Sequence, residues 1–203
     1  MDEVVIKIAK LEEFAEYRRL ASIDEIGRRV LANNAFDGIL TIIGVLMGSF
    51  VAGVKNPNIV LSTGLATCVA MGISGAWGAY MAESAERKHD LQELEQAMLR
   101  DLSGSKQARA AHFAIIVVAL IDGLSPLVAG MTVLVPFLFS GIWPNILYAY
   151  IASIMVALVG LFGLGAFLAT VARENILRVG MRMIIAGIVC IGLTFLLNIN
   201  GSP

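Results

Sequence analysis

Long apolar stretches alternate with short polar segments along this chain. Stretches long enough to cross the ~30 Å hydrocarbon core of a bilayer occur five times, at about residues 36–54, 59–82, 113–138, 146–170 and 179–198. Backbone groups in lipid must form their hydrogen bonds within the protein, and stretches of this length satisfy them as helices rather than as barrel strands. The pattern predicts an all-α membrane protein with five transmembrane helices.

The segment before the first span is amphipathic. Apolar residues recur there at helical spacing among charged ones, at Val4, Ile8, Leu11 and Ala15. This pattern predicts a helix that lies on the membrane, either as an interfacial anchor or as an element that faces a partner. Ser22 followed by Glu25 is a capping-box pattern, which predicts a second helix that starts at Ser22 and enters the membrane near Asn34.

These predictions divide the chain into two regions. Residues 1–34 form amphipathic cytoplasmic or interfacial helices, and residues 35–203 form the five-helix transmembrane domain. The longest polar connection, at about residues 83–112, is predicted to be a cytoplasmic helical segment within that domain.

The overall composition agrees with a membrane protein. Hydrophobic residues make up 58% of the chain, charged residues only 15%, and the mean hydropathy is +0.80. These values exclude an ordinary soluble globule, in which about 45–50% of residues are apolar. A net charge of −1 gives no basic surface for nucleic acid. Cys68 and Cys190 lie inside apolar stretches, so they are interpreted as packing residues rather than a disulfide.

The lysines and arginines predict the orientation, because cytoplasmic flanks of membrane helices retain positive charge. Six precede the first span, five lie between spans two and three, and three lie between or at the edges of spans four and five. Only Lys55 falls on the opposite side. We therefore expect a multi-pass protein of the cell membrane, in particular a prokaryotic cytoplasmic membrane. Its N-terminus is expected in the cytoplasm and its C-terminus outside.

Small residues recur at every fourth position in three spans. They are Gly44, Gly48 and Ala52 in the first, Gly64, Cys68, Gly72 and Ala76 in the second, and Ala149, Ser153 and Ala157 in the fourth. Such faces let membrane helices approach closely. They indicate either tight packing within one protomer or a dimer interface, and the sequence does not separate the two.

Ionisable residues inside the spans are the candidates for chemistry, since each costs ~2.5–3.5 kcal/mol to insert. Asp37 lies at the start of the first span and Asp122 inside the third, while Glu83 and Glu86 close the second. Clustered carboxylates suit a hard divalent cation, and methionine thioethers suit softer ferrous iron. The candidate methionines, each with packing as its alternative role, are Met47, Met71, Met81 and Met131. Each aspartate has an alternative role, Asp37 as a helix cap and Asp122 as a proton relay or interhelical hydrogen-bonding group.

Near Asp122, a proline offers a second oxygen ligand. Pro126 has no N–H to donate to the Asp122 carbonyl four residues before it, which predicts a kinked helix with a free carbonyl beside a carboxylate. Such a pair of oxygens could ligate a cation.

An acidic stripe follows the second span. Its members share one face of a continuing helix and are Glu83, Glu86, Asp90 and Glu93, with His89 beside them. The stripe is either a cytoplasmic metal-collecting site or a solvated face with pairs such as Glu83 and Arg87.

Taken together, the residues favour transport of divalent metal ions. Zinc-binding Cys/His spacing, a phosphate-binding loop and a hydrolase triad do not occur in the sequence, so we expect no enzyme. The alternatives are a membrane scaffold that does not transport and a transporter of another cation.

Three stretches also share a family pattern. Asp37-Gly38 precedes Thr41 and a glycine-containing helix, Gly78-Ala79-Tyr80 lies in the second span, and residues 174–182 open the fifth. With the five spans, they resemble a prokaryotic-type member of the vacuolar iron transporter family. The resemblance implies a homodimer that exports ferrous iron or manganese from the cytosol in exchange for protons, with the metal as transported substrate and no permanently bound cofactor.

The resemblance also implies where the metal path lies. An aspartate of the first helix and a methionine and glutamate of the second line it in this family, and Asp37 matches the aspartate. The family's methionine falls on Gly75 and its glutamate on Ala79 in this chain. Met71 and Glu83 each lie one helical turn from those positions, in opposite directions, and are the expected substitutes.

Overall fold

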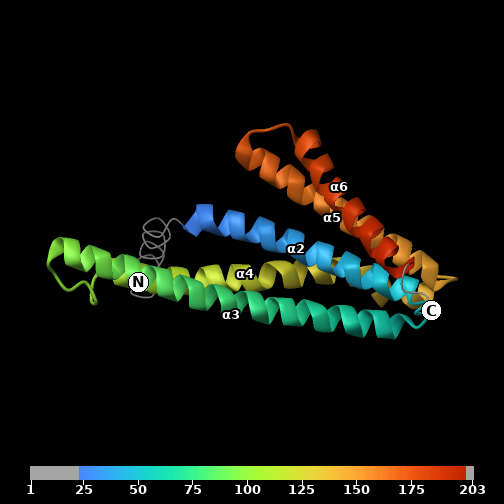
Figure 1. The fold of residues 1–203 in the computed structure, drawn as a ribbon, viewed down its shortest axis with the longest axis horizontal. Helices are drawn as coiled ribbons and strands as arrows, with labels where there is room; N and C mark the ends of the chain where they lie inside the picture. Colours follow the sequence, from blue (N-terminus) through green and yellow to red (C-terminus); the bar gives the residue numbers. More distant parts are fainter. Residues whose placement is uncertain (1–22, 200–203) are drawn as a thin grey trace, which may run out of the picture. The chain divides into compact units, whose positions relative to one another are not determined.

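The computed structural model describes residues 23–199, and the predicted amphipathic helix and the cap at Ser22 lie outside the described residues. The described helices are α2 (Ile23–Val51), α3 (Pro57–Met98), α4 (Lys106–Leu138), the short 3-10 helix η1 (Ser140–Ile142), α5 (Ile146–Ala172) and α6 (Ile176–Ile199) (Figure 1). Among the described residues, five helices are long and apolar enough to cross a membrane. The predicted all-α fold with five long apolar helices is confirmed, whereas the membrane topology and its orientation stay predictions.

Polar side chains mark the starts of four helices. In each case an Asn or Ser side-chain oxygen accepts a hydrogen bond from a backbone N–H in the first helical turn, which otherwise has no partner. The capping residues are Asn56 of α3, Ser105 of α4, Asn145 of α5 and Asn175 of α6. Pro57 follows Asn56 as the first residue of α3, a position where its missing N–H has no cost.

The described residues form two compact units. Unit 1 contains residues 23–31 and 74–123, and unit 2 contains residues 32–73 and 124–199. Each unit has a small set of close helix contacts of its own.

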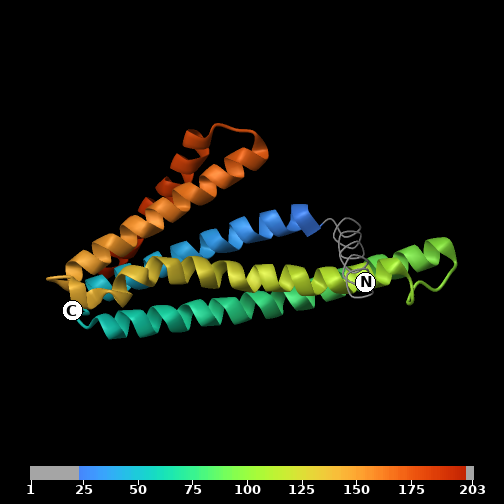
Figure 2. The same cartoon turned by 180° about the vertical axis from the view of Figure 1, so that it is seen from behind.

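Unit 1 is built on a helical hairpin between α3 and α4 (Figure 2). α3 is a single helix of 42 residues, so the predicted continuation of the second span into the acidic stripe is confirmed. Residues 99–105 connect α3 to α4, and the Glu95 carboxylate accepts a hydrogen bond of 2.9 Å from the backbone N–H of buried Leu102 in this turn. The Asp101 carboxylate accepts the Ser103 N–H, and this hydrogen bond lowers the Asp101 pKa.

α3 ends at Met98, and the next residue, Leu99, adopts the left-handed conformation with φ of 49°. The Arg100 N–H bonds the Glu95 carbonyl and the Leu99 N–H bonds the Gln96 carbonyl, a pair of bonds that usually ends on glycine. A leucine pays ~1–2 kcal/mol for this conformation. Its side chain is 93% exposed, so burial does not compensate for that strain.

Leu99→Gly should therefore stabilise the protein. Relief of the strain is partly offset by the ~0.5–1 kcal/mol that the greater freedom of glycine in the unfolded chain costs, so we expect a net gain of about 0.5–1 kcal/mol. Thermal unfolding in detergent checks this, with Leu99→Ala as the control that keeps the β-carbon. A lower melting temperature for the glycine variant than for the alanine variant would contradict the assignment of strain.

Unit 2 contains the main hydrophobic core. Buried side chains from α2, α3, α4 and α5 meet there, including Ile42, Leu46, Val60, Phe137 and Leu161. α5 and α6 lie side by side as an antiparallel pair (Figures 1 and 2). A Cβ atom on Gly165 of α5 would come within 2.6 Å of the Gly180 Cα of α6, so this pair depends on two glycines at its crossing.

The structure separates the roles of the small-residue stripes. Gly64 and Cys68 of α3 are buried, and a Cβ atom on Gly64 would lie 2.7 Å from the Leu134 side chain. The stripe of Ala149, Ser153 and Ala157 on α5 is fully buried. The buried part of the α3 stripe and the whole α5 stripe therefore pack within the protomer. In contrast, Cβ atoms built on Gly44 and Gly48 of α2 would meet no atom within 4 Å.

Candidate functional site

Asp37 lies inside α2 and its side chain is exposed on the protomer. Because α2 begins at Ile23, the alternative that Asp37 caps a helix start is wrong. Asn33 and Thr41, four residues before and after Asp37, are also exposed, and the Thr41 hydroxyl donates a hydrogen bond of 2.8 Å to the Asp37 carbonyl. We call Asn33, Asp37 and Thr41 the α2 polar face.

The residue after Asp37 explains this orientation. Gly38 is buried, and a Cβ atom on it would lie 2.6 Å from the Pro126 carbonyl oxygen and 2.7 Å from the Pro126 Cα. The backbones of α2 and α4 therefore touch at Gly38, which only glycine permits. Consecutive residues are ~100° apart around a helix. Because Gly38 faces α4, the Asp37 side chain lies on a different face of α2, away from α4.

Asp122 lies on α4 in unit 1, with a half-buried side chain. A Cβ atom on Gly75 of α3 would lie 3.1 Å from the Asp122 carbonyl oxygen and 3.4 Å from Oδ1 of its carboxylate. Two oxygens of one residue therefore face α3 at Gly75. α4 runs through Pro126 as one helix, and Pro126 has no N–H for the Asp122 carbonyl.

The two aspartates belong to different units. Asp37 and Pro126 lie in unit 2, whereas Asp122 and Gly75 lie in unit 1. The joint assignment of Asp37 and Asp122 to one metal site stays a prediction.

On α3, part of the acidic stripe is paired. The half-buried Glu83 carboxylate forms an ion pair of 2.9 Å with Arg87, as the solvated-face alternative predicts. His89 Nε2 lies 3.5 Å from Glu93 Oε1, and both side chains are exposed. Glu86 and Asp90 are exposed as well. In the described part of the chain, no three His, Cys, Asp or Glu side chains converge as a metal cluster would require.

Met71 contributes to packing. It lies on α3 in unit 2, is half-buried and contacts the main hydrophobic core. Its role as a metal ligand in place of the family's methionine stays a prediction.

Comparison with known proteins decides the family. The sequence profile of the VIT family matches residues 30–100 and 90–198, which together span most of the chain. This chain belongs to the VIT (vacuolar iron transporter) family. It is also 27% identical over 177 residues to an uncharacterized protein, MJ0645, of Methanocaldococcus jannaschii, an alignment that covers 86% of this chain and 90% of the relative.

Membership in the VIT family confirms the resemblance found in the sequence. It connects this multi-pass membrane protein with iron or manganese transport and places it among transport proteins rather than enzymes. Its relative is archaeal, in agreement with a prokaryotic membrane.

The structure adds one feature at the two positions that the resemblance predicts to depart from the family pattern. Gly75 is the position to which the resemblance assigns the family's methionine, and the carboxylate that lies against Gly75 belongs to Asp122 of α4. Ala79, to which the resemblance assigns the family's glutamate, is buried. Asn33 and Thr41 were not predicted to accompany Asp37, although a spacing of four residues places them on the same helix face. No pattern in the sequence around Gly38 or Gly75 indicates which helix each glycine contacts.

Proposed function

We propose that this VIT family member exports ferrous iron or manganese from the cytosol in exchange for protons, acting as a homodimer. The observation that supports this proposal most directly is the exposed carboxylate of Asp37 on a helix long and apolar enough to span a membrane. Contact between such a group and hydrocarbon costs ~2.5–3.5 kcal/mol or more, so it requires another partner.

A second copy of the chain would supply that partner. Further along α2, Gly44 and Gly48 leave open space where side chains would otherwise lie, and small residues let membrane helices pack closely. Pairing of two α2 helices through this surface would bring two copies of the α2 polar face together. Two aspartates with neighbouring hydroxyl and amide oxygens form the type of oxygen-rich site that a divalent cation needs.

The proposed exchange follows from carboxylate chemistry. Asp37 and Asp122 would bind the metal when ionised and take up protons when the metal leaves, which couples the two flows. The Asp122 carbonyl and carboxylate would supply oxygens at Gly75, the position of the family's missing methionine. With the predicted orientation, both acids lie in the cytoplasmic half of the membrane. Exposed Glu86, Asp90 and Glu93, with His89, would gather metal there.

Metal-dependent stabilisation tests this proposal. We expect ferrous iron and manganese to raise the melting temperature of the purified protein more than zinc, cobalt or magnesium, since bound ligand stabilises the folded state. Asp122→Asn should reduce the shift while leaving the metal-free melting temperature close to that of the unchanged chain. A shift with none of the metals would instead favour the non-transporting scaffold, and a shift with another cation alone would reassign the substrate.

The homodimer has its own test. In a background where Cys68 and Cys190 are replaced by serine, Thr41→Cys should form a disulfide-linked dimer in membranes on mild oxidation, because Thr41 lies on the proposed contact. Val159→Cys, at an exposed position of α5 away from this surface, is the matched control. Equal cross-linking of the two variants would argue against dimer formation through α2.

A further inference from the structure

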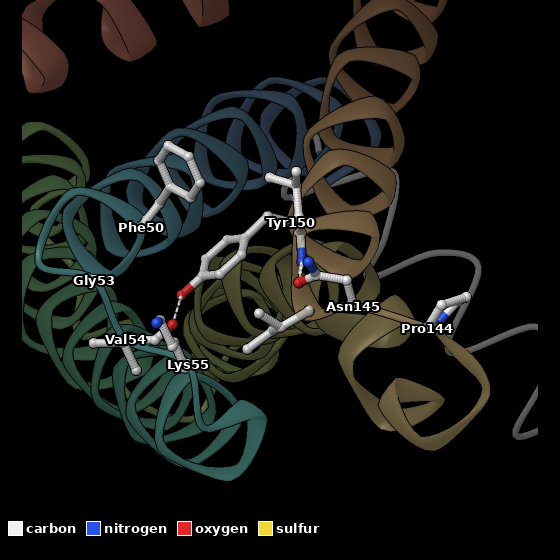
Figure 3. A pocket seen from close by; sticks show the side chains of 9 residues that line it. Phe50, Gly53, Val54, Lys55, Pro144, Asn145 and Tyr150 are labelled. Carbon is white, nitrogen blue, oxygen red and sulfur yellow. Dashed lines mark hydrogen bonds between the residues drawn. The ribbon is translucent and has the colours of Figure 1, made fainter.

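A cavity of about 500 Å³ opens at the end of unit 2 where α2 ends and α5 begins (Figure 3). Its walls are fixed by tertiary contacts. The Tyr150 hydroxyl donates a hydrogen bond of 3.1 Å to the Val54 carbonyl, and the Tyr150 ring packs edge to face on Phe50 with centroids 5.4 Å apart. Lys55 and Asn145 supply polar groups at this cavity.

The cavity carries one positive charge. Lys55 is the only charged residue between positions 38 and 82, and residues 123–172 contain none. In the described part of the chain, Lys55 is exposed and has no ion-pair partner. The Asn145 side-chain oxygen caps α5 at the Leu147 N–H, so its amide N–H groups remain available as donors. These groups suit an anion.

An apolar groove continues from the cavity along α2 and α5. This second hollow has a volume of about 200 Å³ and shares Phe50, Leu147 and Tyr150 with the first. Its other walls are Leu46, Met47, Ile151, Ile154 and Met155. The two hollows together form a cavity with polar groups that suit an anion, continued by an apolar groove.

The position along the helices fits the surface of a bilayer. α2 ends at Val51 and α3 begins at Pro57, so Lys55 lies in the turn between two spans. Trp143, whose indole N–H donates to the Pro136 carbonyl, and exposed Tyr148 lie near the start of α5. Tryptophan and tyrosine are enriched at the headgroup level of membranes. The cavity is therefore at headgroup depth, and the groove extends toward the hydrocarbon.

We propose that this end of unit 2 is a binding site for an anionic phospholipid. The phosphate group binds in the cavity beside Lys55 and the Asn145 amide, and one acyl chain lies in the groove between α2 and α5. A small soluble anion would leave the groove empty, and a metal cation would be repelled by Lys55. A zwitterionic lipid would bring its own cation close to the lysine.

Lipid-dependent thermal stability of the purified full-length protein tests the charged part of the site. We expect phosphatidylglycerol to stabilise the protein at lower concentration than phosphatidylcholine, and inorganic phosphate alone to have no effect. Lys55→Gln should weaken the apparent affinity for phosphatidylglycerol about five-fold, the change that ~1 kcal/mol for one lysine at an anionic membrane corresponds to. Lys88→Gln, at an exposed lysine of the polar part of α3, should leave the apparent affinity for phosphatidylglycerol unchanged.

A second pair of variants tests whether an acyl chain lies in the groove. Ile151→Trp places a large side chain in the groove, whereas Val159→Trp changes a similarly exposed residue of the same helix outside it, with exposures of 52% and 67%. Only Ile151→Trp should reduce the stabilisation by phosphatidylglycerol. Unchanged lipid selectivity in Lys55→Gln would overturn the proposal, as would equal effects of the two tryptophan variants. A Lys55-dependent shift with inorganic phosphate alone would identify a simple anion site and overturn the lipid assignment.

Discussion

Asp37→Asn is expected to abolish metal transport by the reconstituted protein. A carboxylate ~4 Å from a unit charge contributes ~4 kcal/mol at an effective dielectric constant of about 20, and ~1.4 kcal/mol corresponds to a factor of ten, so flux should fall by about 100-fold or more. Asparagine keeps the size of the side chain and one acceptor oxygen but not the charge or the exchangeable proton. Flux of manganese into proteoliposomes, with the protein content of each preparation measured, checks this result.

The matched control is Glu174→Gln, which removes a negative charge from an exposed side chain in the turn between α5 and α6. It should transport at the rate of the unchanged chain. Because the Asp37 side chain is exposed on the protomer, Asp37→Asn should also keep the melting temperature of the metal-free protein. Full transport by Asp37→Asn would remove this residue from the metal path.

Gly38→Ala is expected to destabilise unit 2 strongly. The new Cβ atom would lie 2.6, 2.7 and 3.0 Å from the carbonyl oxygen, Cα and carbonyl carbon of Pro126. Backbone atoms cannot rotate away as a flexible side chain does, so α2 and α4 must separate. Overpacking of this kind costs ~1–3 kcal/mol, and more where the neighbour is rigid. Thermal unfolding in detergent should show a clear drop in melting temperature.

Gly163→Ala provides the comparison for Gly38→Ala. Gly163 lies inside α5, and a Cβ atom there would meet nothing within 4 Å. Alanine is a better helix former than glycine by ~1 kcal/mol, so this variant should be as stable as the unchanged chain or slightly more stable. If both variants melt at the same temperature, the close contact at Gly38 is not a determinant of stability.

The spans could be predicted from the sequence because lipid leaves the backbone few choices. An apolar stretch such as residues 146–170 must satisfy its own N–H and C=O groups, and α5 at Ile146–Ala172 coincides closely with it. The continuation of α3 beyond Glu83 was also predictable, since residues there have high helix propensity and Glu83 pairs with Arg87 one turn later.

The candidate site was predictable only in part. Asp37 and Asp122 were identified by their charge, which is expensive inside a membrane. Their surroundings depend on which helices meet, and helix contacts leave little trace in a single sequence. The contact between Gly38 and Pro126 and the contact between Gly75 and Asp122 join residues far apart in the chain. Nothing distinguishes Gly38 from Gly163 by residue type, although one touches a helix backbone and the other faces open space.

Coupled metal and proton flux in proteoliposomes tests the central claim most directly. Vesicles that contain the unchanged chain are loaded with a pH indicator, and ferrous iron or manganese is added outside while internal metal and internal pH are followed together. We predict metal uptake above that of protein-free vesicles, with protons moving in the opposite direction and both signals lost in Asp37→Asn. Metal flux no greater than in protein-free vesicles, for both iron and manganese, would contradict the account.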